Sequence, residues 1–440
     1  MSVMVVEQQM KVCFLLGSGL SRPASFPCLE QIGSRVLSGD NIVKISGVYH
    51  EKQPSACAAA LKDEELERVL RFLHWLEVMA NLRFETTPHR ANYEDLFYLA
   101  SQIHYDILGE YENPAVRPFI RDALFNLCES IPASAVSLDQ LGDLAGETTN
   151  YIRDVVALML TKPPGRTEYL KLFLDAAHDS TVSALNLFTL NHDKLLEGYF
   201  HNKIHFIDGF GEEDSLRRIR RWSPTLFDAT VPGRGVAAVR LFKLHGSIDW
   251  HRFRPRQFSH VGSDSNPWNE EYVGIGSNPA LEVEGHCLIL VGTFNKMIDY
   301  TDAVFFEMHH RLMCALAEAE RLIVCGYGFG DKGINKRITE WMCLSSTRKI
   351  LVIDPKTPDK LKEFARRAIE TKIAGWKRKG RWIHWDKGLD APEITWDRIA
   401  KDFIRADNHC GANRRRAGGQ RRLKNDCRPS RRRRASKSTV

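Results

Sequence analysis

Short apolar runs recur along the chain, and most of them are followed by glycine or by polar residues. A strand buried on both faces of a parallel sheet carries such a run, because neither face meets water. The runs lie at residues 12–16, 182–188, 236–244, 287–291, 321–325 and 349–353. Helical segments separate several of them, and strand–helix alternation of this kind predicts an α/β fold with a parallel, doubly wound sheet.

A long helical segment interrupts the alternation between the first two strands. From about residue 63 to about residue 175, apolar residues recur at three- and four-residue spacing, as on the buried face of a helix. Helices are expected around residues 66–76, 93–108, 151–160 and 169–177. Asn92 can cap the second of these helices, because Glu94 and Asp95 follow in its first turn. The sheet is therefore expected to carry a large helical insertion, at about residues 50–180.

The last third of the chain has a βαβ pattern. A helix at residues 302–320 precedes the strand at 321–325, and a helix at 334–344 follows it. Thr357 and Pro358 are expected to begin a further helix, as its N-cap and first-turn residues. The polar, glycine-rich stretch from Phe258 to Pro279 is expected to be a surface loop.

Composition places the chain among globular proteins. Its 440 residues are 43% hydrophobic, which is enough for a substantial core in one large domain or two smaller ones. No apolar run approaches the roughly 20 residues of a membrane span, and the first ten residues lack the order of a signal peptide. We expect a cytoplasmic protein without a membrane partner. The ten cysteines form no Cys-x-x-Cys pair, so reduced, packed thiols are expected and no metal site.

The basic charge is concentrated at the C-terminal end. Residues 411–440 contain twelve Lys or Arg and one acid, a net charge of +11, so the preceding 410 residues carry −4 of the chain's +7. We expect a first domain at residues 1–405 and a disordered basic tail at 406–440. The tail could contact nucleic acid through phosphates without reading sequence, or it could be a solvated extension without a task.

Candidate chemistry lies where the strands end. Gly17-Ser18-Gly19 follows the first strand, and a glycine turn there lets the backbone approach a phosphate. Arg22 replaces the third glycine of the usual dinucleotide motif, and Asp40 lies in a turn, so an ordinary dehydrogenase is not favoured. The other strand ends carry Asn191-His192-Asp193, His245-Gly246-Ser247, Gly326–Asp331 and Asp354.

In this order the strand ends resemble the sirtuin superfamily, and specifically its bacterial sirtuin-like branch. Four motifs within residues 12–355 carry the resemblance: Gly17-Ser18-Gly19-Leu20-Ser21, Thr189-Leu190-Asn191-His192-Asp193, His245-Gly246-Ser247 and residues 326–335 (Gly-Tyr-Gly-Phe-Gly-Asp-Lys-Gly-Ile-Asn). Two features of the protein-deacylating members are missing. Ser25-Phe26-Pro27 stands where they carry Asp-Phe-Arg, and only unpaired cysteines stand where they carry a four-cysteine zinc module.

The resemblance implies a Rossmann-like, sirtuin-like NAD-binding domain and a set of site residues. Asn191 would orient a water molecule and the ribose, and His245 would be the base. Asp193 would hold the nicotinamide carboxamide. The remaining cofactor contacts would be Gly17, Ser18 and Gly19 at the pyrophosphate, Ser21, Gly246 and Ser247 nearby, and Gly326, Tyr327, Phe329 and Asp354 at the adenosine half. His192 is expected to pack, and His201, His205, His309 and His310 to be surface or helix residues without metal-ligand spacing.

The function that the resemblance implies is NAD+ glycohydrolase activity, with NAD as substrate, in bacterial antiphage defence by NAD depletion. Members of this branch imply a homo-oligomer and a defence partner such as a HerA-like ATPase, an Argonaute or a phage-sensing domain. Two alternatives stay open from the residues. One is an NAD-dependent protein deacylase, and the other is a non-catalytic nucleotide-sensing or nucleic-acid-binding subunit.

Overall fold

The computed structural model of the protein describes residues 10–52, 64–84, 90–109, 118, 138–228, 238–254, 271–278, 280–283, 285–291, 303–365 and 367–406. The chain divides into a first unit that ends at Ile394 and a second that begins at Thr395. Except for its first residue, the predicted basic tail at 406–440 lies outside the described residues.

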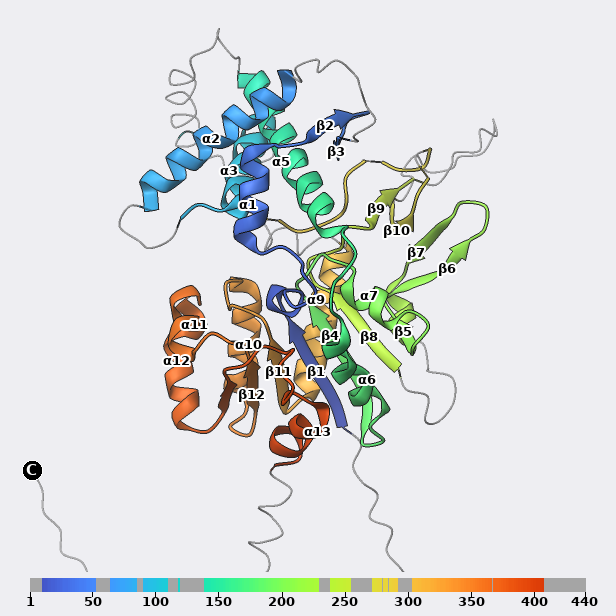
Figure 1. The fold of residues 1–440 in the computed structure, drawn as a ribbon, viewed down its shortest axis with the longest axis vertical. Coiled ribbons are helices and arrows are strands. Elements are labelled where there is room, and N and C mark those ends of the chain that lie inside the picture. The colour runs from blue at the N-terminus through green and yellow to red at the C-terminus, as the bar shows by residue number, and fades with distance from the viewer. Residues whose placement is uncertain are drawn as a thin grey trace, which may run out of the picture. The chain divides into compact units, whose positions relative to one another are not determined.

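A seven-stranded parallel sheet forms the centre of the first unit, as the apolar runs predict (Figure 1). Its strands are β1 (Met10–Leu16), β4 (Val182–Thr189), β5 (His205–Ile207), β8 (Ala238–Lys243), β11 (Arg321–Cys325), β12 (Lys349–Ile353) and β13 (Trp382–Trp385). They pair in the order β13-β12-β11-β1-β4-β8-β5, and every pairing is parallel. The predicted α/β, Rossmann-like fold class is confirmed. The run at Cys287–Val291 is an exception, because it contributes only a single bridge, from Ile289 to Gly246.

Helices cover both faces of this sheet, which explains why its strands are apolar throughout. On one face, α9 (Ala303–Glu318), α10 (Lys332–Leu344) and α12 (Arg367–Arg378) share a buried core with alternate sheet residues such as Cys13 and Leu15. On the other face, Phe173 of α6 (Lys171–His178) packs edge-on against Phe14, with ring centroids 5.1 Å apart. Successive residues of β1 therefore enter opposite cores.

The helical insertion lies beyond the carboxyl ends of the strands (Figure 1). It contains α1 (Leu29–Ser38), α2 (Glu64–Phe84), α3 (Tyr93–Leu108), α5 (Leu138–Leu160) and an unpredicted hairpin of β2 (Ile42–Ile45) and β3 (Val48–Glu51). Asn92 caps α3 as predicted, because its side chain accepts hydrogen bonds from the backbone of Glu94 and Asp95. A 3-10 turn, η2 (Glu168–Leu170), then leads into α6.

A second sheet was not predicted from the sequence. It is antiparallel, in the order β6-β7-β10-β9, and consists of β6 (Phe210–Asp214), β7 (Ile219–Trp222), β9 (Trp250–Phe253) and β10 (Tyr272–Gly276). The prediction of a surface loop from Phe258 to Pro279 is wrong at β10, and residues 258–270 and 279 of that stretch lie outside the described part. Strand β10 contains two glycines in five residues, so it depends on its neighbours β7 and β9 for its conformation.

Short elements complete the described residues. In the first unit these are η1 (Ser18–Leu20), α7 (Leu195–Phe200), η3 (Pro224–Asp228) and α11 (Pro358–Phe364). Thr357 caps α11 as predicted, with Pro358 in the first turn. The second unit contains α13 (Trp396–Ile399), capped by Thr395, and a π-helical turn at Ala400–Ile404.

The described residues contain six free cysteines. Free thiols are present at Cys13, Cys28, Cys287, Cys314, Cys325 and Cys343, and burial raises the pKa of both Cys13 and Cys287 to about 12. Among the helices that the structure describes, none combines the length and the apolarity needed to cross a bilayer.

Candidate functional site

The topology of the large sheet places two loops on either side of a switch point. Strands β1 and β11 are neighbours, but the chain leaves β1 toward β4 on one side and leaves β11 toward β12 on the other. In open α/β sheets, ligands bind in the crevice outside the carboxyl ends of two such strands. The loops at this point are Gly17–Ser21 and Gly326–Asp331, which both belong to the predicted set.

Glycine is required in these loops because their backbones touch. The N–H groups of Gly17 and Gly19 donate to the carbonyls of Cys325 and Gly326, at 3.0 and 2.9 Å. A Cβ atom on Gly17 would lie 2.6 Å from the Gly326 oxygen, and one on Gly19 would lie 2.6 Å from the Gly326 Cα. Gly326 has a φ of +62° and equally little space. The N–H groups of Gly17 and Gly19 are used to hold the loop in place. Pyrophosphate binding by Gly17, Ser18 and Gly19 stays a prediction.

The side chain of Asn191 is fixed in one orientation at the end of β4. Its amide nitrogen donates to the Gly17 carbonyl at 3.1 Å and to Ser21 Oγ at 2.9 Å. Because the carbonyl can only accept, the nitrogen must face Gly17. Asn191 is only 9% exposed, and among the described residues its amide oxygen has no hydrogen-bond partner. That oxygen is therefore available to accept a hydrogen bond from water or from a sugar hydroxyl.

Ser21 connects Asn191 to Asp193. The Ser21 hydroxyl donates to Asp193 Oδ2 at 2.7 Å, and the Leu195 N–H donates to Asp193 Oδ1 at 3.0 Å. All three polar side chains are buried. Two predicted motifs that lie 170 residues apart in sequence are thus joined by direct hydrogen bonds. The assignment of Asp193 to the nicotinamide carboxamide stays a prediction, since both carboxylate oxygens already accept bonds.

His245 follows β8 and is paired with an acid. Its Nε2 lies 3.3 Å from Asp331 Oδ2, and the His245 side chain is 4% exposed. The other oxygen of Asp331 accepts the Ile334 N–H at 2.9 Å, which caps α10. The carboxylate lies close enough to stabilise a protonated His245 ring. The motif at residues 326–335 therefore supplies a partner for the predicted base, a role that the sequence did not reveal.

Tyr327 and Phe329 build the loop that holds Asp331. The Tyr327 hydroxyl donates to Asn335 Oδ1 at 3.0 Å and accepts the Asp331 N–H at 3.2 Å, and Asn335 donates to the Phe329 carbonyl at 2.6 Å. Phe329 is fully buried, with a φ of +58°. Both rings lie inside the protein, so their predicted adenosine contacts would have to come from the backbone of this loop.

A buried lysine network lies beneath the Asn191 and His245 loops. Lys243 Nζ lies 2.6 Å from the Asp193 carbonyl, 2.7 Å from Glu197 Oε1 and 2.8 Å from Ser247 Oγ. Burial raises the pKa of Glu197. Ser247 is 0% exposed and its hydroxyl donates to Asp249, so this hydroxyl belongs to the network, and contact of Ser247 with NAD stays a prediction. Lys243 was not among the predicted site residues. A lysine inside the apolar run 236–244 could have indicated a buried ion pair.

Gly246 and Asp354 occupy the two flanks of the site. Gly246 has a φ of +76°, and a Cβ there would lie 2.1 Å from the Leu288 carbonyl, so only glycine allows this turn against residues 287–291. Asp354 follows β12, is 6% exposed, and accepts the Lys356 N–H at 2.8 Å. Burial raises the pKa of Asp354. Its place beside the β11 loop fits the predicted adenosine side of the crevice.

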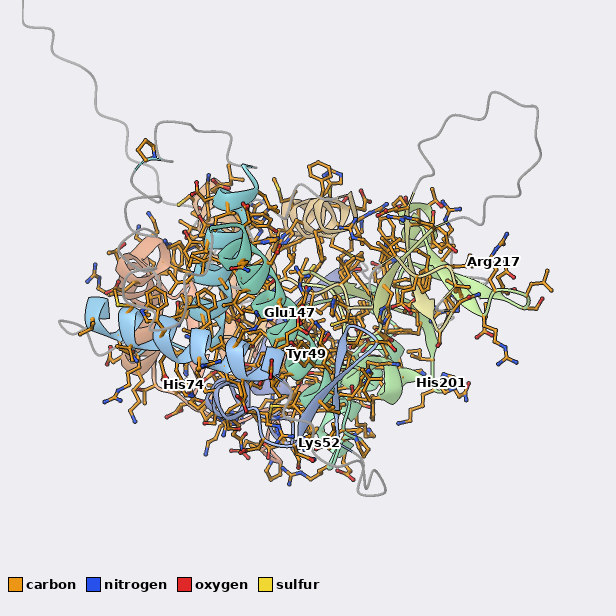
Figure 2. All side chains as sticks on the ribbon, turned by 90° about the horizontal axis from the view of Figure 1, so that it is seen from above. Tyr49, Lys52, His74, Glu147, His201 and Arg217 are labelled. Carbon is orange, nitrogen blue, oxygen red and sulfur yellow. The ribbon has the colours of Figure 1, made fainter. Side chains whose placement is uncertain are left out.

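Three histidines gather at the base of the site. The ring centroids of His192 and His309 lie 6.3 and 6.4 Å from that of His245. His309 is a helix residue as predicted, but it is 2% exposed. Its spacing with the buried residues Phe305, Met308 and Leu312 on α9 could have placed it on the inner face. His201, His205 and His310 are exposed, and Figure 2 shows His201 at the periphery.

His309 should make stability depend on pH. Burial lowers the pKa of His309 to about 2, from an ordinary value of 6.5. Below about pH 6.5 the unfolded chain therefore binds a proton that the folded chain does not, and stability falls by about 1.4 kcal/mol per pH unit from this residue. We expect His309→Gln to remove that slope between about pH 6.5 and about pH 5.5 in urea unfolding. Equal slopes in the two proteins would show that His309 takes up a proton without unfolding.

Over the part of the chain that the structure describes, His, Cys, Asp and Glu side chains form no group of three that could hold a metal ion.

Comparison with known families agrees with the resemblance read from the motifs. Residues 185–373 match the family model described as SIR2-like domain. The matched range begins in β4 and includes Asn191, His245, Asp331 and Asp354, whereas the Gly17–Ser21 loop precedes it. No curated protein matches the chain. The predicted sirtuin-like resemblance is thereby confirmed over these residues, and a SIR2-like domain suggests a function related to NAD.

Proposed function

Because the chain carries a SIR2-like domain, we propose that it is an NAD+ glycohydrolase that cleaves NAD+ into nicotinamide and ADP-ribose. The fixed amide of Asn191 is the observation that carries the proposal. With both of its N–H groups bonded to Gly17 and Ser21, Asn191 presents an acceptor oxygen at the carboxyl edge of the sheet. Such an oxygen can orient a water molecule, or a ribose hydroxyl, for reaction at the adjacent sugar carbon.

The chemistry needs few groups, and the site has them. Nicotinamide leaves the ribose as a neutral molecule, because the pyridinium nitrogen takes the electron pair of the breaking bond. No general acid is required. The attacking water adds to the ribose carbon and must lose one proton, for which the His245 imidazole is the base in our proposal. Asp331, at 3.3 Å from Nε2, stabilises the positive charge that His245 then acquires.

The His245 and Asn191 loops are tied to each other, as a two-residue mechanism requires. The Ile248 N–H donates to the His192 carbonyl at 3.1 Å, and Lys243 lies between both loops. A displacement of one loop would therefore move the other. This coupling supports a single site and does not depend on the family match.

Asp331→Asn tests the role of the acid. Asparagine is also a good N-cap, so α10 should keep its first turn while the charge beside His245 is lost. We expect nicotinamide release from NAD+ to fall roughly 10- to 100-fold, because a general base contributes about 100-fold or more and loses its orienting partner here. The melting temperature should change little. A variant that releases nicotinamide at the wild-type rate would remove Asp331 from the mechanism.

The proposal extends to bacterial antiphage defence, by depletion of NAD in the infected cell, and to work as a homo-oligomer with a separate regulatory partner. Cells that express the chain should lose NAD+ and form fewer phage plaques after infection. Cells that express His245→Ala should do neither. Protection that persists in His245→Ala would separate defence from NAD cleavage.

A further inference from the structure

A large cavity lies in the helical insertion, apart from the residues assigned to NAD. Its volume is about 940 Å³, and its walls come from α2, α3, α5 and residues 285–290. Among the described residues, none of those predicted to contact NAD lines this cavity. A volume of this size can hold a nucleotide-sized ligand.

Arg153 lines the cavity with a guanidinium group that the protein does not satisfy. Its Nε is buried and has no hydrogen-bond partner, and no ion pair to Arg153 is formed within the described part of the chain. Its guanidinium also lies over the ring of Phe97, with the ring centroid 5.5 Å from Cζ, and its charge acts on the buried thiol of Cys287. Buried donors in native proteins are nearly always paired, so an unpaired arginine at a cavity wall indicates an absent acceptor.

Three carboxylates, those of Glu65, Asp143 and Glu147, also line the cavity, and Glu65 pairs with Lys44 at 3.2 Å. Asp154 accepts from His286 Nδ1 at 2.8 Å and from the Tyr49 N–H at 2.8 Å. Glu147 accepts from the Tyr49 hydroxyl at 2.6 Å and pairs with Lys44 at 2.6 Å. Figure 2 shows Tyr49 and Glu147 side by side. Arg68, Arg153 and Arg252 bring three guanidinium groups to the lining, and within the described part of the chain Arg153 forms no ion pair with the lining carboxylates.

The remaining lining suits an aromatic ring beside the anion. Phe97, His104 and Tyr105 of α3 face the cavity together with Leu144 and Leu288. Guanidinium groups match the geometry of phosphate oxygens, and aromatic side chains match a base. A nucleoside phosphate combines both features.

The floor of the cavity is also the support of the His245 loop. Leu288, Ile289 and Leu290 line the cavity. Their backbone holds the loop, because the Ser247 N–H donates to the Leu288 carbonyl at 3.2 Å and the Leu290 N–H donates to the His245 carbonyl at 2.9 Å. A ligand that packs on these three residues would bear directly on the position of the proposed base.

We propose that this cavity binds a nucleoside monophosphate, or another small phosphate-bearing ligand with an aromatic base, and that its occupancy regulates the site at His245. The phosphate pairs with Arg153, and the base lies against the aromatic residues of α3. The regulatory part rests on the proposed NAD+ glycohydrolase function. The binding part does not.

Calorimetric titration of the full chain with AMP and with adenosine tests the binding. We expect AMP to bind and adenosine to bind at least about tenfold more weakly, since a charge-assisted pair with phosphate is lost. Arg153→Gln should weaken AMP binding at least about tenfold. Asn150→Trp, which places a large ring in the cavity without changing its charge, should also weaken AMP binding. Arg71→Gln removes an arginine of α2 outside the cavity and should leave binding unchanged.

Asp354→Asn distinguishes the cavity from the adenosine side of the crevice. AMP binding that survives Asp354→Asn and fails in Arg153→Gln supports the proposal. The reverse pattern would place AMP in the crevice and overturn the proposal. The absence of AMP binding at millimolar concentration would also overturn it, and would mean that water fills the cavity.

The regulatory part of the proposal is tested by nicotinamide release. AMP should change the release at least twofold in the wild type and not in Arg153→Gln. If the wild type releases no nicotinamide at all, the proposed function fails while the binding result still stands.

Discussion

Lys243→Met is expected to lower the free energy of unfolding by about 3 kcal/mol, because it leaves Glu197, whose side chain is only 18% exposed, without its cation. Lys243 is 3% exposed, and it also supports the Asp193 carbonyl and Ser247. A protein of ordinary stability has only about 5–15 kcal/mol in total, so the loss is a large share. Chemical denaturation at neutral pH measures it.

Lys194→Met is the matched control for this prediction. Lys194 pairs with Asp249 at 3.0 Å, but its side chain is 52% exposed, so its removal should cost less than about 1 kcal/mol. Adding Glu197→Gln to Lys243→Met should restore part of the lost stability, because the uncompensated charge is removed. If Lys243→Met and Lys194→Met unfold at the same denaturant concentration, the buried network around Lys243 does not stabilise the fold as we expect.

His245→Ala should reduce nicotinamide release about 100- to 10,000-fold, which is the range for loss of a general base. NAD+ binding should persist, because the glycine loops and Asp354 are unchanged. The measurement is single-turnover release from NAD+, combined with calorimetric binding of NAD+ to the variant.

His251→Ala provides the comparison. His251 lies on β9 and pairs with Glu282 at 2.6 Å. The variant therefore removes the same kind of side chain from a position outside the proposed site. Its nicotinamide release should stay within about twofold of wild type. Comparable losses in the two variants would mean that the effect of His245→Ala comes from the fold and not from the reaction.

The large sheet was predictable because a strand that is buried on both faces has a continuous run of apolar residues in the sequence. Apolar runs such as Arg321–Cys325 and Lys349–Ile353 match β11 and β12 to the residue. The antiparallel sheet leaves no comparable trace. Strand β10 is Tyr-Val-Gly-Ile-Gly, and its extended form depends on pairing with β7 and β9, which come from distant parts of the chain. Local pattern cannot supply such partners.

The sequence was enough to predict where the site residues lie in the fold, but not which of their side chains contact one another. Parallel strands end at one edge, so Asn191 and His245 had to approach each other, and the structure ties their loops together. The sequence could not show that Ser21 bonds both Asn191 and Asp193, or that Asp331 faces His245. These contacts depend on side-chain directions after folding. Ser247 was predicted to contact NAD, yet its hydroxyl is bonded inside the lysine network, because a turn residue can point to either side.

Release of nicotinamide from NAD+ by the purified full chain, measured together with ADP-ribose, tests the central claim most directly. The assay contains no acyl-lysine peptide, and it compares wild type with Asn191→Ala and His245→Ala. We expect equal amounts of nicotinamide and ADP-ribose from the wild type, and at least about a 100-fold loss in both variants while both stay folded. A wild-type protein that binds NAD+ and leaves it intact, or variants that cleave it as fast as wild type, would contradict the account.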